Sequence, residues 1–227
     1  MRGDTNERYE ALLRLRDRQG QDMVPGSVFG VVYNHELGLA LDRWVIAHSI
    51  RVLRERQARG HSMILFINIS PTILQDEELL NWLQGGLQKT GVPAASLVFE
   101  IPETTADLNQ QALLPFLQRL KALGCGLSLD QFSGHERSQA LAQLLGVDYV
   151  KLSARFAQNL LTDKERQQQL AQLARLLTIQ NITVIVTGVE DAGTLPALWS
   201  CGIDYVQGFF LQRPHTDLSY DFDQTVL

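Results

Sequence analysis

The sequence predicts an α/β fold in which helices cover a parallel sheet. Short apolar segments alternate with longer amphipathic segments along the whole chain, and no low-complexity stretch interrupts them. Such an alternation is typical of parallel strands joined by right-handed helical crossovers. The chain has 227 residues, of which 45% are hydrophobic and 20% charged, and this is enough for one large domain with a substantial core.

The overall charge and the two cysteines argue against several classes of protein. A net charge of -5 disfavours non-specific binding to a nucleic-acid polymer. Cys125 and Cys201 lie in apolar stretches without metal-ligand spacing, as expected of buried thiols in a reducing compartment. The sequence shows neither an apolar run of about 18 residues nor a signal peptide. We therefore expect a soluble, cytoplasmic protein without membrane insertion.

The first strand is expected within Arg8–Leu15, although the periodicity of this segment fits a strand or a helix. As a strand, it would place Glu10, Leu12 and Arg14 on one face, with a carboxylate beside a guanidinium. The segment Gly20–Gly26 that follows is turn-like.

The next part of the chain predicts two helices and two buried strands. Leu37–Arg59 has apolar residues three and four positions apart, as in a helix. Met63–Ile69 is a continuous apolar run, which predicts a buried strand that leads into a helix over Asp76–Gln88. Ser96–Ile101 is a second such strand and ends at Glu100.

The middle of the chain continues the alternation. Pro102 is suited to the first turn of a helix, and the amphipathic segment Leu108–Leu123 is expected to be a helix that stops at Gly124. Leu127–Asp130 is a short apolar strand that ends on a carboxylate, Asp130, and runs into a glycine-containing loop.

The C-terminal half is expected to repeat the same unit. A helix near Gln139–Leu145 precedes the strand Val147–Leu152, which carries Lys151. A polar helix is expected over Asp163–Thr178, and Ile182–Val186 is a β-branched strand.

The last elements complete a set of seven strands. Gly188-Val189-Glu190 is expected to open a helix, and Asp204–Gln207 is the last strand. Seven strands are one fewer than a closed eight-stranded barrel requires. Either the sheet is open or a first strand is missing, and we favour truncation from a longer multidomain protein. Because no linker or composition shift divides the chain, we expect one domain over residues 1–227.

Polar residues recur near the C-terminal ends of the predicted strands. They are Glu10, Asn68, Glu100, Asp130, Lys151, Thr187 and Gln207. In a barrel the strand ends form one mouth, and carboxylate and amide oxygens there suit Mg²⁺ or Mn²⁺. Alternatively, strand ends are polar because they reach solvent, and Asp130 caps a helix that starts near Glu136. The regularity from strand to strand favours a functional site.

Seven short motifs resemble those of the EAL-domain family, which hydrolyses the bacterial second messenger cyclic di-GMP. They follow the order and spacing of the family over essentially the whole chain. The motifs are Tyr9-Glu10-Ala11-Leu12-Leu13-Arg14, Asn68-Ile69-Ser70, Phe99-Glu100-Ile101-Pro102-Glu103, Leu129-Asp130-Gln131-Phe132, Asp148-Tyr149-Val150-Lys151, Thr187-Gly188-Val189-Glu190 and Asp204-Tyr205-Val206-Gln207-Gly208. The resemblance implies a (β/α)8 TIM-type barrel with one reversed strand, whose first strand would lie before Met1.

The resemblance also implies roles for individual residues. The family's metal ligands correspond to Glu10, Asn68, Glu100 and Asp130. Lys151 corresponds to the lysine near the attacking water and Gln207 to a late polar contact. Glu103 and Glu190 would be supporting acids that brace the loop after Asp130.

Two departures from the family pattern predict that the chain is not an enzyme. Active members carry an aspartate where this chain has Gln131, and a glutamate where it has Thr187. Both changes remove negative charge from the positions of two divalent ions, and neither side chain can replace a carboxylate as ligand and base. We interpret the chain as a degenerate phosphodiesterase that requires no metal cofactor.

The ligand of such a degenerate domain is expected to be cyclic di-GMP itself. Removal of two carboxylates leaves Arg14 and Lys151 with fewer opposing anions, which favours binding of two phosphates without metal. The expected ligand-binding residues are Leu12, Arg14, Asp42, Asn68, Lys151, Glu190, Gln207, Phe209 and Pro214, with Phe210 as a further apolar surface. Alternatively, Asp42 is a helix-surface charge and either phenylalanine belongs to the core.

Among degenerate members, the opening of the chain and the Leu129-Asp130-Gln131-Phe132-Ser133 run resemble the FimX-type receptors. This resemblance implies a cyclic di-GMP effector in type IV pilus assembly and twitching motility, with a PilZ-domain protein as partner. Two alternatives remain: a weak metal-dependent phosphodiesterase, and an adaptor that binds only protein.

Overall fold

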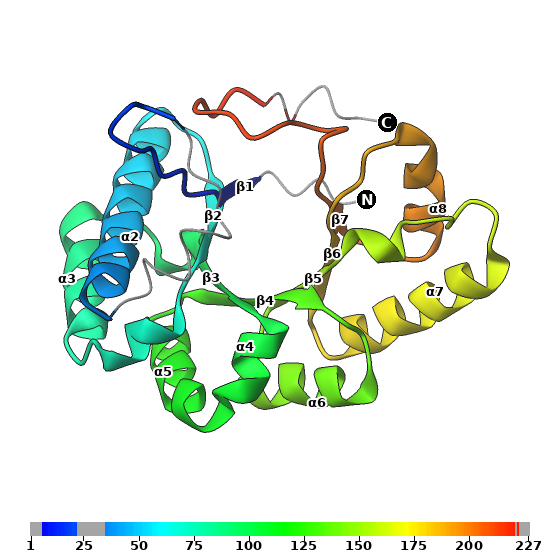
Figure 1. Ribbon diagram of the computed structural model, residues 1–227, viewed down its shortest axis with the longest axis horizontal. Coiled ribbons are helices and arrows are strands. Elements are labelled where there is room, and N and C mark those ends of the chain that lie inside the picture. The colour runs from blue at the N-terminus through cyan, green and yellow to red at the C-terminus, as the bar shows by residue number, and fades with distance from the viewer. Residues whose placement is uncertain (1–5, 22–34, 221, 223–227) are drawn as a thin grey trace. The chain divides into compact units, whose positions relative to one another are not determined.

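The computed structural model describes residues 6–21, 35–220 and Phe222 (Figure 1). The chain divides into two compact units. The first comprises Met1–Ile101 and Leu108–Gly126, and the second comprises Pro102–Asp107 and Leu127–Leu227. Each unit contains parallel strands that alternate with helices along the chain, as predicted.

The first unit is built on three parallel strands. They are β1 (Glu7–Ala11), β2 (Met63–Asn68) and β3 (Leu97–Pro102), and β2 pairs with both of the others. The helical elements are α2 (His35–Ala58), η1 (Pro71–Gln75), α3 (Leu79–Thr90), η2 (Ala94–Ser96) and α5 (Gln110–Ala122). Figure 1 shows α2 and α3 side by side, and both helices are in contact with each other.

Burial explains why these segments form these elements. Four of the six residues of β2 are buried, as expected of a central parallel strand with a mostly apolar sequence. The buried leucines of α3 and α5 recur three and four positions apart on one helix face. Helix α3 ends at Gly91, whose φ of 72° is left-handed, and a glycine adopts this conformation without the steric cost that other residues incur.

The start of β1 is fixed by charged side chains. The Glu7 carboxylate accepts a hydrogen bond from Arg56 Nη2 at 2.5 Å, and the second Glu7 oxygen lies 2.7 Å from His61 Nδ1. These contacts join β1 to the C-terminal end of α2 and to the loop before β2. Together with the parallel pairing of β1 with β2, they hold this polar segment as a strand at the start of the unit.

The second unit is built on four strands, each parallel to the next. They are β4 (Gly126–Phe132), β5 (Tyr149–Leu152), β6 (Thr183–Val186) and β7 (Tyr205–Val206). The helical elements are α4 (Glu103–Leu108), α6 (Glu136–Leu145), η3 (Ala154–Phe156), α7 (Lys164–Ile179), η4 (Ala192–Thr194) and α8 (Leu195–Ser200).

The predicted order of seven strands and intervening helices is confirmed, and the starts of two helices differ from the prediction. The predicted helix Leu108–Leu123 corresponds to α5, which begins at Gln110 because Asn109 has non-helical dihedral angles, and Leu108 is the last residue of the separate helix α4. The last helix begins at Leu195 rather than Gly188, because the intervening residues form a loop that bonds to the segment after β7. The predicted turn Gly20–Gly26 falls mostly outside the described residues.

No helix in the described ranges combines the length and the hydropathy that a membrane crossing requires.

Candidate functional site

In the first unit, three of the predicted site residues lie at neighbouring strand ends. Asn68 Nδ2 donates a hydrogen bond to Glu10 Oε1 at 3.1 Å, which joins the ends of β1 and β2. Asn68 is also the register partner of Glu100 on β3, and the Glu100 side chain is fully buried. The structure therefore brings together the carboxylate, amide and carboxylate that the alternation of strands predicted.

Leu12 and Arg14 follow directly after β1. The strand ends at Ala11, so the expectation that Glu10, Leu12 and Arg14 share one strand face is wrong in this detail. Both side chains are nevertheless exposed, and Arg14 Nη1 donates to the carbonyl of Leu13 at 3.0 Å.

Asp42 is a buried carboxylate on the inner side of α2. Ser70 Oγ donates a hydrogen bond to Asp42 Oδ2 at 2.5 Å, and Ser70 and Asp42 are both buried. The interpretation of Asp42 as a helix-surface charge is therefore wrong. Burial raises the pKa of Asp42 to about 6, against the lowering effect of the Ser70 hydrogen bonds.

This pKa predicts a pH-dependent difference in stability between the wild type and Asp42→Asn. The pKa in the folded protein lies above the ordinary value of 3.8, so the folded state holds the proton more tightly than the unfolded state. The contribution of Asp42 is most favourable below about pH 4 and is lost as the pH rises through about 6. We expect Asp42→Asn to match the wild type at pH 4 and to be more stable by about 2 kcal/mol at pH 7.

Urea unfolding at a series of pH values would measure this difference. The wild type itself is the control, because all other titrating groups are common to both proteins. A difference that does not change with pH would show that Asp42 does not titrate abnormally.

In the second unit, Asp130 lies within β4 and is half-buried. Helix α6 takes its N-cap from His135, so the alternative that Asp130 caps this helix is wrong.

The register of β4 against β5 shifts between Leu129 and Phe132, which is a β-bulge. Gln131 sits in this bulge with a φ of 54°. Asp and Asn are much more common than glutamine in this left-handed region. The backbone conformation at Gln131 therefore suits the aspartate that active members of the EAL-domain family carry at this position better than it suits glutamine.

The Thr187 side chain is bonded to the backbone of the neighbouring strand. Its Oγ1 donates to the carbonyl of Leu152 at 3.0 Å, and its backbone N–H donates to the same carbonyl at 2.8 Å. The hydroxyl is neutral, and its proton is already donated to the Leu152 carbonyl. Because both side chains are neutral, neither Thr187 nor Gln131 supplies the negative charge of a carboxylate ligand.

Other predicted residues lie near the ends of β5 and β7. Lys151 is buried on β5. The backbone of Gln207 donates to Val186 and accepts from the N–H of Val189 at 3.0 Å, which links the loops after β6 and β7. Glu190 is exposed, and its carboxylate forms no hydrogen bond or ion pair with the described residues. The predicted role of Glu190 in bracing the loop after Asp130 is therefore not supported by a contact among these residues.

Phe209, Phe210 and Pro214 are exposed on the segment after β7, so the two phenylalanines do not belong to the core. The guanidinium of Arg213 lies over the Phe209 ring, 5.0 Å from its centroid. An exposed aromatic ring with a cation on its face is a surface on which a planar base can stack.

The expected brace by Glu103 is observed in the second unit. Glu103 Oε2 accepts from the backbone N–H of Ser133 at 2.7 Å. Glu103 Oε1 accepts from the hydroxyls of Ser133 and Ser138 at 2.8 and 2.9 Å. One carboxylate thus holds the loop after β4 against the first turns of α6. The two serines were not predicted as partners of Glu103, although Ser133 directly follows the motif that contains Asp130.

Removal of this brace is expected to destabilise the second unit. Glu103→Ala leaves one backbone N–H and two hydroxyls without their acceptor, and we expect a loss of about 2 kcal/mol in the free energy of unfolding. Glu103→Gln keeps one acceptor oxygen and should lose less. Urea unfolding would measure both, with Glu136→Ala, an exposed acid of α6, as the control.

Comparison with known proteins gives a consistent result. The sequence model of the EAL-domain family matches residues 1–214. Cyclic di-GMP phosphodiesterase PdeF of Escherichia coli is 29% identical over 94% of this chain, which spans only 28% of that protein. The crystal structure of the FimX EAL domain from Pseudomonas aeruginosa bound to c-di-GMP is 36% identical, with a TM-score of 0.88 over 97% of this chain and 89% of that chain.

A second FimX structure supports the same relationship. The FimX EAL domain of Xanthomonas citri in complex with c-diGMP is 28% identical, with a TM-score of 0.85 over 95% of this chain and 85% of that chain. The similarity extends over nearly all of this chain, and it confirms the predicted fold class, that of the TIM-type EAL domains.

Proposed function

The chain belongs to the EAL-domain family, and we propose that it is a receptor for cyclic di-GMP that no longer hydrolyses this dinucleotide. The observation that carries the proposal is the hydrogen bond from Thr187 Oγ1 to the carbonyl of Leu152. The bond supports the proposal because Thr187, which corresponds by motif to a glutamate of the enzymes in this family, is neutral and its hydroxyl proton is already donated to the backbone. Gln131 adds a second neutral side chain at an aspartate position.

The loss of two carboxylates argues against catalysis on physical grounds. In metal-dependent phosphodiester hydrolysis the cations generate the nucleophilic water and neutralise developing charge. Loss of one group that orients or holds such a cation typically costs about 10- to 100-fold. Two losses at one site are expected to leave little activity.

The same losses favour ligand binding without metal. A ligand with two phosphates is repelled by a cluster of carboxylates, and this repulsion falls when two of them are neutral. Arg14 would then contact a phosphate, and Asp42 would accept from the N–H groups of a guanine. The full proposed set is Leu12, Arg14, Asp42, Asn68, Lys151, Glu190, Gln207, Phe209 and Pro214.

A role in signalling follows from the relatives rather than from the site. Two FimX EAL domains with bound c-di-GMP are among the similar structures. We propose that this chain likewise acts as a cyclic di-GMP effector, that it serves type IV pilus assembly and twitching motility, and that its partner is a PilZ-domain protein. The single-domain organisation of residues 1–227 within a longer signalling protein belongs to the same proposal.

Calorimetric titration with cyclic di-GMP, first in EDTA and then in excess Mn²⁺, tests the proposal. We expect saturable binding with affinities that differ by less than about twofold between the two conditions, because no metal bridges protein and phosphate. Chromatography of the Mn²⁺ sample should reveal no linear dinucleotide. The control is the double variant Gln131→Asp/Thr187→Glu, in which the restored carboxylates should make binding depend on the metal.

A weak phosphodiesterase is the second candidate, favoured by the retained contact between Asn68 and Glu10 and by the buried Glu100. It predicts Mn²⁺-dependent formation of the linear product and no binding in EDTA. An adaptor without a nucleotide ligand would show binding in neither condition. The two titrations therefore separate all three functions.

A further inference from the structure

Helix α2 carries an apolar stripe on its outer side in addition to the face that it buries. The buried face includes Ile46, Ile50 and Leu53. On the other side Leu37 and Trp44, seven residues apart, are 56% and 55% exposed. Single exposed apolar residues are normal, but a tryptophan and a leucine seven residues apart lie on the same side of the helix.

The side chains around Trp44 are held in place. The Trp44 ring stacks on His48, with 5.0 Å between ring centroids and 20° between planes. Arg51 Nη2 lies 2.7 Å from His48 Nδ1, one turn further along α2. An ordered aromatic surface binds with less loss of side-chain entropy than a mobile one.

A second exposed tryptophan lies on α3, which packs against α2, and is joined to α2 through Arg43. Arg43 binds Asp76 through two nitrogens at 2.5 and 2.6 Å, and its guanidinium lies 5.6 Å from the centroid of the Trp82 ring. Trp82 is 37% exposed. We refer to Leu37, Trp44, His48, Arg51, Arg54 and Trp82 together as the aromatic–basic face.

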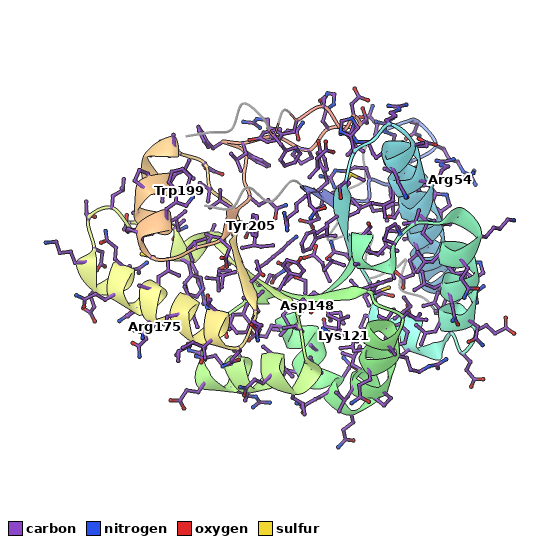
Figure 2. The ribbon with its side chains drawn as sticks, turned by 180° about the vertical axis from the view of Figure 1, so that it is seen from behind. Arg54, Lys121, Asp148, Arg175, Trp199 and Tyr205 are labelled. Carbon is purple, nitrogen blue, oxygen red and sulfur yellow. The ribbon has the colours of Figure 1, made fainter. Side chains whose placement is uncertain are left out.

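The C-terminal end of this face is positively charged, although the chain has a net charge of -5. Figure 2 shows Arg54 on α2, and both Arg51 and Arg54 are exposed. Neither forms an ion pair with another residue in the described part of the chain. Two cations without carboxylate partners, on the same helix as the exposed Trp44, favour a partner that is both apolar and acidic.

We propose that the aromatic–basic face binds an acidic amphipathic helix of a partner protein. The spacing of Leu37, Trp44 and Arg51 at seven-residue intervals matches the seam along which two helices pack. A leucine-rich stripe on the partner would cover Leu37 and Trp44, and acidic residues would meet Arg51 and Arg54. This inference does not depend on whether the chain binds cyclic di-GMP.

Two other occupants fit the face less well. An anionic membrane would attract Arg51 and Arg54, but surfaces that recognise anionic lipids typically carry about four to eight basic residues, and the aromatic–basic face contributes two arginines. In a second copy of the chain packed in parallel, the two arginines would face the same arginines of the first copy. Charge complementarity therefore favours a partner with acidic residues.

A designed peptide tests the proposal directly. The probe is a fluorescein-labelled peptide of about 21 residues with leucine at heptad positions a and d and glutamate at e and g. A second peptide has lysine in place of every glutamate. By fluorescence anisotropy, we expect saturable binding of the glutamate peptide and at least about tenfold weaker binding of the lysine peptide.

Two variants and two matched controls locate the binding surface. Trp44→Ala and the double variant Arg51→Glu/Arg54→Glu should each weaken binding of the glutamate peptide at least about tenfold. Trp199→Ala on α8 and Arg175→Glu on α7, both exposed and labelled in Figure 2, should change it by less than about twofold. Because the two variants alter different side chains, either one shows whether the aromatic–basic face binds the peptide if the other variant fails to fold.

Four outcomes would overturn the proposal. The first is that the wild type does not bind the glutamate peptide, and the second is that the control variants lose as much affinity. The third is that the chain binds phosphatidylglycerol vesicles through Trp44 but not the peptide, which would identify a membrane surface. The fourth is a dimer in sedimentation that Trp44→Ala dissociates, because the face would then be occupied by a second copy.

Discussion

Gly208→Ala is expected to lower the free energy of unfolding of the second unit by more than about 3 kcal/mol. A Cβ atom at Gly208 would lie 2.0 Å from the carbonyl oxygen of Val189 and 2.4 Å from its nitrogen. Both atoms belong to the backbone, so no side-chain rotation can relieve the overlap. The N–H of Val189 bonds to Gln207, and the N–H of Phe210 bonds to Val189. Separation of the two loops would break both hydrogen bonds.

The substitution should also impair ligand binding on the proposed function, because these loops carry Glu190, Gln207 and Phe209. Urea unfolding followed by circular dichroism would measure the stability. The matched control is Gly202→Ala, whose φ of 78° is left-handed but whose Cβ would meet no atom within 4 Å. We expect it to cost only about 1 kcal/mol, from backbone strain alone. Equal losses for both variants would contradict the close approach at Gly208.

Most of the fold was predictable because each element carries its own local pattern. The apolar run of β2 and the β-branched run of β6 lie within one residue of the predicted strands. Prediction failed where a segment is shaped by distant backbone contacts. The loop before α8 is an example, because Val189 donates its N–H to Gln207 instead of beginning a helix at Gly188.

The same distinction applies to the candidate site. Glu10, Asn68 and Glu100 could be predicted as neighbours, because each lies at the end of a strand and these strands are adjacent in the sheet. The bonds of Asp42 to Ser70 and of Glu103 to Ser133 could not. They join residues about thirty positions apart, one of them in a loop or at a helix start, where no periodicity constrains the side chain.

Substitution of Arg14 is expected to cause a large loss of affinity for cyclic di-GMP. On the proposed function, Arg14→Ala should weaken binding of cyclic di-GMP in EDTA by about 10- to 100-fold, because a charge-assisted contact to phosphate is lost. Arg14 is exposed on the segment after β1, and among the described residues its guanidinium bonds only through Nη1, to the adjacent carbonyl of Leu13. The rest of the guanidinium can therefore take a phosphate in a bidentate manner, which Arg14→Lys cannot reproduce in full.

The matched control for Arg14 is Arg18→Ala, an exposed arginine of the same segment, which should change the affinity by less than about twofold. Neither variant should change the urea midpoint, because neither side chain is buried. Calorimetry in EDTA at two salt concentrations would measure the affinities, and the wild type should lose more affinity with salt than Arg14→Ala does. Equal affinities for Arg14→Ala and the wild type would mean that the phosphates bind elsewhere. Because Arg14 is the exposed cation that the metal-free proposal relies on, that result would also remove the argument that lost carboxylates favour binding without metal.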